Sequence, residues 1–264
     1  MDVEIRPARA DDYAAFTRLF GELAIPDPVP SAERFETTLV PQMRVAVADE
    51  VIGYVTWRPY GSLVHVVQLA VDRNMRGRRI GESLLEHVRG EALALGCERW
   101  YLNVKRDNTP ALRLYERCGF RHELEAVVMK LPWAQVPPAT DIRIAEPDED
   151  AAIAARFKIP AERITTLRAR GMRMIALRDA AGAVIGFAPF DPGFPGAPSF
   201  YADRPELAPA LLAAIRAYAL PQYDFVRLTV EGDRALADAV LALGAELTFE
   251  ILRLGAPLSG IVPR

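Results

Sequence analysis

The chain has 264 residues, of which 51% are hydrophobic and 25% charged, and its formal net charge is −3. This composition is typical of soluble globular proteins and suffices for one large core or two ordinary ones. Charges of both signs are mixed along the sequence without a basic block, so we predict no nucleic-acid partner. No apolar run approaches the ~20 residues that span a bilayer, and the N-terminus lacks the apolar core of a signal peptide. We therefore expect no membrane partner and a cytoplasmic location.

Cysteine and histidine usage gives no sign of a metal site. Cys97 and Cys118 are the two cysteines and do not form a CxxC pair, and no His/Cys cluster has zinc spacing. We expect no metal and two reduced thiols, with a disulfide between them as the alternative.

The first half alternates β-type and helical segments. Its clearest helix has apolar residues every three or four positions from Ile80 to Leu95, and Gly96 ends it. In chain order we predict a strand at 3–6, helices at 11–23 and from Ser31, strands at 44–48, 51–57 and 63–71, a helix at 78–95, a strand at 100–104, a helix at 109–118 and a strand at 127–131.

A proline-rich segment, 132–140, separates this half from a second one in which the same pattern restarts. Asp203 follows Asp72 by 131 residues and Gly244 follows Gly119 by 125, so a whole domain is repeated. The second half is predicted to contain strands at 142–145, 172–177, 184–190 and 199–203, a helix at 206–219, a strand at 225–231, a helix at 234–243 and a strand at 247–254. We predict an α/β fold with a first domain at 1–133, a linker at 134–140, a second domain at 141–256 and a tail at 257–264.

The segment Gln68–Leu85 carries the strongest chemical signal. A buried-type strand runs through a turn rich in arginine and glycine directly into the amphipathic helix. The first amides of a helix have no partner within the helix, and the helix dipole is positive there, which suits a pyrophosphate. Candidate ligands are Arg76, Gly77, Arg78, Arg79, Ile80, Gly81 and Glu82. The alternative is a solvated basic helix cap.

A second signal lies in Leu102–Phe120, where a strand leads into a short helix that carries Tyr115. If Thr109 caps this helix with Pro110 at its first position, the Asn108 side chain is free for a ligand. The alternatives are that Asn108 is itself the cap and that Tyr115 is an ordinary packed tyrosine.

Together these segments resemble the GNAT superfamily of N-acetyltransferases over residues 3–131. The phosphate loop of that superfamily, Arg/Gln-x-x-Gly-x-Gly/Ala, corresponds to RGRRIG at Arg76–Gly81. The later pattern Asn-x-x-Ala-x-x-x-Tyr matches Asn108, Ala111 and Tyr115. The family usually has glycine at the position of Arg79, where a side chain suits a helical start but not a strained turn. The resemblance implies two tandem GNAT-like domains, each a mixed, mostly antiparallel sheet flanked by helices.

The resemblance implies an acyltransferase of EC class 2.3.1 that uses acetyl-CoA as acyl donor. The pantetheine arm would pair with the backbone of Leu69, Ala70 and Val71, and an N–H near Val71 would stabilise the oxyanion. Tyr115 would protonate the departing thiolate as general acid. Relatives often have a glutamate where this chain has Gln68, which can only orient a water.

No general base is identified from the sequence. An odd/even count along the strand puts His65 on the face opposite Gln68, and Glu22 is a remote candidate.

The second half lacks the residues that carry this chemistry. Its loop after Tyr201 has neither glycine nor an arginine cluster, and Val240 takes the place of Tyr115. We expect a degenerate domain that acts as a built-in dimer partner, and hence a monomer. The predicted acceptor is a small-molecule primary amine. The alternatives are a peptide or protein N-terminus or lysine and, outside enzymes, an acyl-CoA sensor or scaffold.

Overall fold

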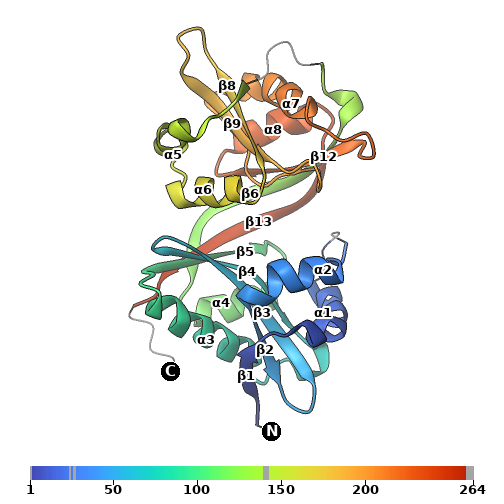
Figure 1. Cartoon of the computed structure of the whole chain (residues 1–264), viewed down its shortest axis with the longest axis vertical. Helices are drawn as coiled ribbons and strands as arrows, with labels where there is room; N and C mark the ends of the chain where they lie inside the picture. The colour runs from blue at the N-terminus through green and yellow to red at the C-terminus, as the bar shows by residue number, and fades with distance from the viewer. Residues whose placement is uncertain (1, 24, 26–27, 139–142, 260–264) are drawn as a thin grey trace. The chain divides into compact units, whose positions relative to one another are not determined.

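The computed structural model describes residues 2–23, 25, 28–138 and 143–259 (Figure 1). Its backbone contacts divide the chain into a first unit, Met1–Glu123 with Leu254–Arg264, and a second unit, Leu124–Arg253. Among the described residues, every helix is too short or too polar to cross a membrane.

The first unit has a sheet whose strands follow the order β1-β2-β3-β4-β5-β13. Strands β1 to β4 pair antiparallel, and β4 pairs with β5 in parallel. The elements are β1 (Glu4–Pro7), α1 (Tyr13–Phe20), α2 (Ala32–Arg34), β2 (Met43–Val47), β3 (Val51–Tyr60), β4 (Leu63–Val71), α3 (Ile80–Ala94), β5 (Arg99–Lys105), α4 (Thr109–Arg117) and the start of β6 (Arg121–Pro132).

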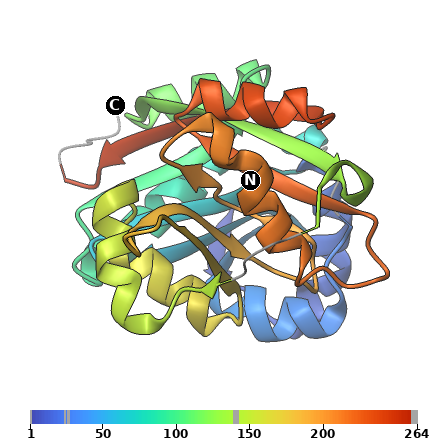
Figure 2. The same ribbon diagram turned by 90° about the horizontal axis from the view of Figure 1, so that it is seen from above.

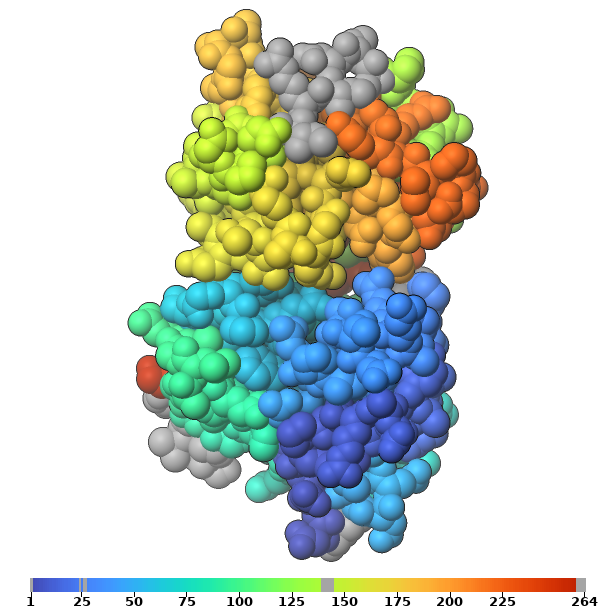
Figure 3. Space-filling model, viewed as in Figure 1, coloured from blue at the N-terminus to red at the C-terminus, as the bar shows by residue number. Residues whose placement is uncertain are grey.

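Helices cover both faces of this sheet. On one face, Phe16 of α1 packs against Tyr54 of β3, with the ring centroids 5.3 Å apart. On the other face, a side chain at Gly53 would meet Leu84 of α3 at 3.4 Å. Alternate residues of β3 therefore point to α1 and to α3, as the pleat of a strand requires. In the space-filling view the segment from α1 to α2, in blue, forms an outer surface of this unit (Figure 3).

The second unit repeats the pattern with shorter strands. A four-stranded sheet runs in the order β11-β9-β8-β7. Strands β6, β12 and β10 are neighbours in the sheet that contains β13. The elements are β7 (Arg143–Ile144), α5 (Asp150–Phe157), α6 (Ala161–Ala169), β8 (Arg173–Arg178), β9 (Val184–Phe190), β10 (Gly196–Ala197), β11 (Tyr201–Ala202), α7 (Ala208–Arg216), β12 (Phe225–Glu231), α8 (Arg234–Ala242) and β13 (Glu246–Pro257). Figure 2 shows α5 and α6 on one side of β8 and β9 and α7 on the other.

The same local contacts recur in both halves, as expected for a repeated domain. The backbone N–H of Asp72 donates to the Ile52 carbonyl at 2.9 Å, and that of Asp203 donates to the Ile185 carbonyl at 2.9 Å. A helix arginine forms an ion pair with each of these aspartates, Arg18 in the first half and Arg156 in the second.

The unit boundaries differ from the predicted domain boundaries because two long strands change units. Strand β6 begins in the first unit and continues into the second, whereas β13 begins in the second unit and ends in the first. Next to β5, the N–H of Leu258 donates to the Glu98 carbonyl at 2.7 Å, and Arg89 donates to the Leu258 carbonyl at 2.8 Å. The described part of the predicted tail, residues 257–259, thus belongs to the first unit, where Leu258 is fully buried. The predicted linker lies partly outside the described residues, and its residues 134 and 135 end a short helix, Trp133–Gln135.

Most predicted elements are present, with shifted ends. The helix predicted at 78–95 begins at Ile80, and the last strand of the first half starts at Arg121 rather than at 127. The strand predicted at 199–203 is reduced to Tyr201–Ala202.

We predict that Leu258→Ala destabilises the first unit although its position lies far along the chain from the rest of that unit. Leu258 is fully buried, so truncation leaves a cavity and lowers the free energy of unfolding by about 2–4 kcal/mol. Leu247→Ala is the control, because Leu247 is 53% exposed and its loss changes stability by less than about 0.5 kcal/mol. Chemical denaturation measures both; equal effects would contradict this assignment of the C-terminal strand.

Candidate active site

The site begins where β4 and β5 stop pairing. Their parallel register runs from Leu63↔Arg99 to Val66↔Leu102 and ends there, although β4 continues to Val71. At the same level a β-bulge interrupts the pairing of β4 with β3, because Thr56 lies opposite Gln68 while Trp57 lies opposite Val66. Beyond the bulge, β4 has one edge directed away from β3 and not paired with β5.

The bulge corrects the predicted orientation of His65. The extra residue, Val67, shifts the alternation of β4, so His65 lies opposite Arg58 and Gln68 opposite Thr56. Since Arg58 and Thr56 share a face of β3, His65 and Gln68 share that face as well. The His65 ring stacks on Tyr101 at 4.4 Å between centroids, and Tyr54 donates a hydrogen bond to Gln68 at 3.3 Å.

The free edge of β4 presents the backbone of alternate residues. The Asp72 N–H points to β3, so alternation directs the N–H and C=O groups of Leu69 and Val71 away from β3 and those of Ala70 towards it. Of the three predicted pairing residues, two therefore have their backbone groups on the open edge.

The turn between β4 and α3 is held in a specific conformation. The Asp72 carboxylate accepts from the Asn74 N–H at 2.9 Å, which with Arg18 lowers the pKa of Asp72. Gly77 has φ +79°. Arg79, the cap of α3, has φ 61° and ψ 12°, the left-handed conformation. The helix predicted from residue 78 therefore begins only after Arg79, and the turn before it is the strained kind that favours the glycine of the family pattern.

The arginines of this turn differ in their surroundings. Arg76 donates to the Val71 carbonyl at 3.2 Å and to Glu22 at 2.8 Å, and Arg73 donates to Glu22 at 3.0 Å. Glu22 is thus held by two cations, which disfavours it as a general base. Arg78 and Arg79 are exposed and form no ion pair or hydrogen bond through their side chains within the described ranges.

Gly81 has a packing role that the sequence did not indicate. A Cβ at this position would lie 3.1 Å from the side chain of Leu114 in α4, so this glycine lets α3 pack closely on its neighbours. The next residue, Glu82, accepts from Arg117 of α4 at 2.9 and 2.7 Å.

Helix α4 corrects one prediction and positions Tyr115. Asn108, not Thr109, caps the helix, because its side-chain oxygen accepts from the Ala111 N–H at 3.2 Å. Tyr115 is buried, with its ring edge-on to Phe120 at 5.9 Å. Burial raises the pKa of Tyr115, and the neighbouring Cys118 raises it further, so the phenol stays protonated at neutral pH. Cys97 and Cys118 are both free thiols.

Helix α7 of the second unit has fewer backbone N–H donors at its start. Pro205 stands in the turn before it and Pro209 in its first turn, and proline has no N–H to donate. Val240, fully buried in the core, takes the place of Tyr115 four residues before Gly244, which has a positive φ like Gly119.

An ion cluster lies at the corresponding strand ends. Counting from the paired positions Gly53↔Val71 and Gly186↔Ala202, Ser199 takes the place of Gln68. Glu231, at the end of β12, accepts from Tyr201 at 2.9 Å and pairs with Arg163 and Arg253. Burial would raise the pKa of Glu231, but the two arginines lower it overall. Arg163 also donates to Ser199 at 2.7 Å.

Comparison with known proteins decides the family. The sequence pattern of the acetyltransferase (GNAT) family matches residues 11–120, which contain the bulged strand, the arginine-rich turn and α4. This match identifies the first domain as an acetyltransferase domain of the GNAT family.

Solved structures extend the likeness of fold to the whole chain. A GCN5-related N-acetyltransferase from Sphaerobacter thermophilus is 17% identical with a TM-score of 0.70, covering 99% of this chain and 98% of that one. A tandem GNAT protein from the clavulanic acid biosynthesis pathway is 17% identical with a TM-score of 0.65, covering 99% of this chain and all of that one. At this identity the likeness concerns the fold, and it agrees with two GNAT-like domains in one chain.

Residues on the α1 side of β3 were missed by the sequence analysis. Tyr54, Thr56 and Arg58 form a row beside Gln68 and His65. The alternation of β3 signals the row itself, but only the bulge in β4 connects it with His65.

We predict that Arg79→Gly leaves stability unchanged or raises the free energy of unfolding by up to about 1 kcal/mol, because it relieves a left-handed conformation. Arg78→Gly is the matched control. Arg78 has no positive φ, so glycine there lowers stability by about 0.5–1 kcal/mol. Thermal unfolding of both variants measures these changes. An equal loss of stability in the two would show that the turn at Arg79 is unstrained.

Proposed function

We propose that the first unit transfers the acetyl group of acetyl-CoA to a primary amine of a small molecule. The observation that carries this proposal is the continuity of the site: the open edge of β4 leads through one turn to a helix N-terminus, beside two arginines whose side chains pair with none of the described residues. The family uses acetyl-CoA, and this arrangement supports its binding here.

The proposed coenzyme site uses backbone groups first and arginines second. The Leu69 C=O and the Val71 N–H and C=O face outward and suit the amides of the pantetheine arm. The N–H groups of Ile80, Gly81 and Glu82 begin α3 and suit the pyrophosphate. Arg78 and Arg79 add charge, and Arg76 reaches the phosphates by giving up its contact with Glu22. Asn108 holds the start of α4 and acts through Tyr115, as a positioning residue.

The proposed reaction is a direct displacement. The neutral amine attacks the thioester carbonyl, a C–N bond forms, the C–S bond breaks, and the Leu69 N–H near the bulge stabilises the oxyanion. Tyr115 donates its proton to the departing thiolate. His65 takes the proton of the amine, directly or through a water held by Gln68, since both side chains lie on one face. Arg58 and Tyr101 are the charged and titratable groups that face His65 from the neighbouring strands.

The second unit is proposed to be structural. Its prolines remove amide donors, its counterpart of β4 is broken into β10 and β11, and the Glu231 cluster lies at the strand ends. We therefore expect one coenzyme site per chain and, because the duplicated domain serves as an internal partner, a monomer.

A calorimetric titration with acetyl-CoA tests the coenzyme site. Wild-type protein is expected to bind one equivalent, and the double variant Arg78→Glu/Arg79→Glu to bind about 10- to 100-fold more weakly because two cations near the phosphates become anions. Arg204→Glu, an exposed change before α7, is the control and leaves binding unchanged. No binding by the wild type would refute the proposed function, and two equivalents would refute a structural second unit.

The pH dependence of kcat/KM tests the acid and the base on one acceptor amine. Tyr115→Phe is expected to lower kcat about 100-fold with coenzyme binding retained. Because the pKa of Tyr115 is raised, its ionisation does not lower the wild-type rate below pH ~10. His65→Gln is expected to lower kcat about 100-fold with coenzyme binding retained. A Tyr115→Phe or His65→Gln variant with full kcat would assign the proton transfers elsewhere.

A further inference from the structure

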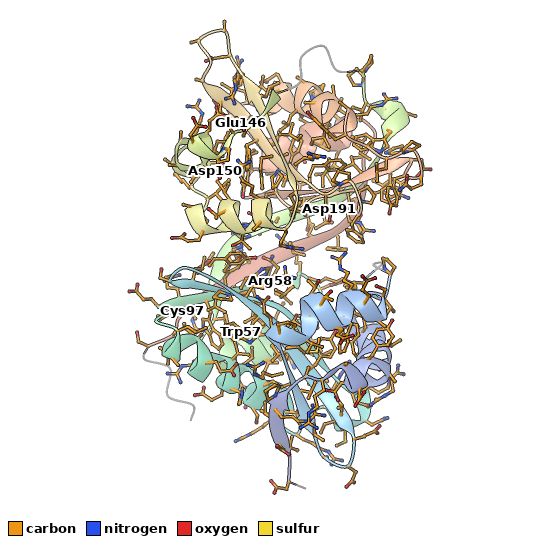
Figure 4. The ribbon with its side chains drawn as sticks, in the orientation of Figure 1. Trp57, Arg58, Cys97, Glu146, Asp150 and Asp191 are labelled. Atoms are coloured by element: carbon orange, nitrogen blue, oxygen red, sulfur yellow. The ribbon has the colours of Figure 1, made fainter. Side chains whose placement is uncertain are left out.

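Arg58 is a cation without a counter-charge. It lies on β3 and is half-buried, and its Nε donates to the side-chain oxygen of Gln42 at 3.3 Å (Figure 4). Across the part of the chain that the structure describes, Arg58 forms no ion pair. A guanidinium is charged at every physiological pH, and burying it even partly without an anion is unfavourable. Its contact with Gln42 uses Nε and leaves both terminal nitrogens available.

The position of Arg58 connects it with the proposed acceptor side. Arg58 shares a face of β3 with Thr56 and Tyr54, and across the strand it faces His65. The hydroxyl of Thr56, which is only 4% exposed, has no hydrogen-bond partner among the described residues. A buried polar atom is usually satisfied, so this second observation points to a polar ligand on the same row.

The row on β3 has the charged Arg58 at one end, followed by the uncharged Thr56 and Tyr54. Alternate residues on a strand are about 7 Å apart, so Arg58 and Thr56 lie within reach of one small molecule. His65 and Gln68 lie opposite them. An anion beside Arg58 would place a neighbouring amine of the same molecule close to His65.

We propose that Arg58 binds the carboxylate of the acceptor, so that the substrate is a small amino acid whose amine is acetylated. The proposal rests on the function proposed above and specifies its acceptor class. The planar guanidinium fork matches a carboxylate with two parallel N–H···O bonds, which lysine cannot reproduce. Thr56 donates a further hydrogen bond from its hydroxyl, and Arg58 is a specificity-determining residue.

Matched acceptors test the proposal. Free L-amino acids, their amides and the corresponding decarboxylated amines are compared by release of coenzyme A thiol. For the wild type, kcat/KM is expected to be about 10- to 100-fold higher for the acid than for its amide. Arg58→Gln is expected to abolish this preference, mainly through KM, and Arg58→Lys to retain part of it. Arg204→Gln, in the second unit, is the control and keeps the full preference.

A binding measurement separates this inference from the proposed function. N-acetyl amino acids and their amides are titrated into wild type and Arg58→Gln in the presence of coenzyme A. Weaker binding of the acid, but not of the amide, in Arg58→Gln supports the proposal even if no tested amine is turned over. Equal binding of acid and amide by the wild type overturns it. A preference for aminoalkyl phosphates over amino acids, when both are tested as acceptors, also overturns it. Thermal unfolding and acetyl-CoA binding check that each variant is folded.

Discussion

The bulge at Val67 is the constraint on which the proposed site depends. One extra residue in β4 ends the regular ladder with β3 at the level where the pairing with β5 also stops. The strand therefore offers outward backbone groups at Leu69 and Val71 instead of a paired edge. The same residue reverses the alternation on its N-terminal side and brings His65 to the face of Gln68. A regular strand would pair with its neighbours along its whole length but could offer neither arrangement.

How far the sequence predicts this structure depends on the range of the interaction. Helix α3 follows from its apolar spacing, and the duplication follows from recurring motifs, because both are local or repeated patterns. The face of His65 was wrong because a bulge is set by pairing with β3 and leaves no trace in residue spacing. The start of α3 was placed too early because Arg79 occupies the left-handed position at which a glycine would have indicated a turn. The cap of α4 was left between Thr109 and Asn108 because two adjacent residues could both cap the helix, and only the geometry of α4 shows that Asn108 does so.

The assignment of the C-terminal strand end to the first unit also depends on a contact that is distant in the sequence. Residues 254–258 are apolar enough for a strand, but their partner Glu98 lies more than a hundred residues earlier in the sequence. Nothing near Leu258 indicates which half it completes, so a boundary drawn from composition assigns it to a tail. Helices α5 and α6, which the sequence analysis did not predict, are short and have weaker apolar patterns, and their stability comes from packing on Phe187 and Met174.

The two halves separate what the fold requires from what the chemistry requires. Both retain the ion pair between a helix arginine and the aspartate after the central strand, a side-chain cap on the short helix, and a glycine in the left-handed conformation after it. These features hold backbone in place and tolerate changes elsewhere. The second half has fewer amide donors at the start of α7, no tyrosine at the position of Tyr115, and only short strands in place of β4, and it has the buried Glu231 cluster at the corresponding strand ends. In a coenzyme site the strand ends must stay accessible. In the second half, Arg163 and Arg253 pair with the Glu231 carboxylate at the strand ends, and these ion pairs stabilise a buried arrangement there. Under the proposed function, the duplicated fold persists without its activity, because folding depends on the frame that both halves share, whereas catalysis would depend on the few groups that only the first half presents.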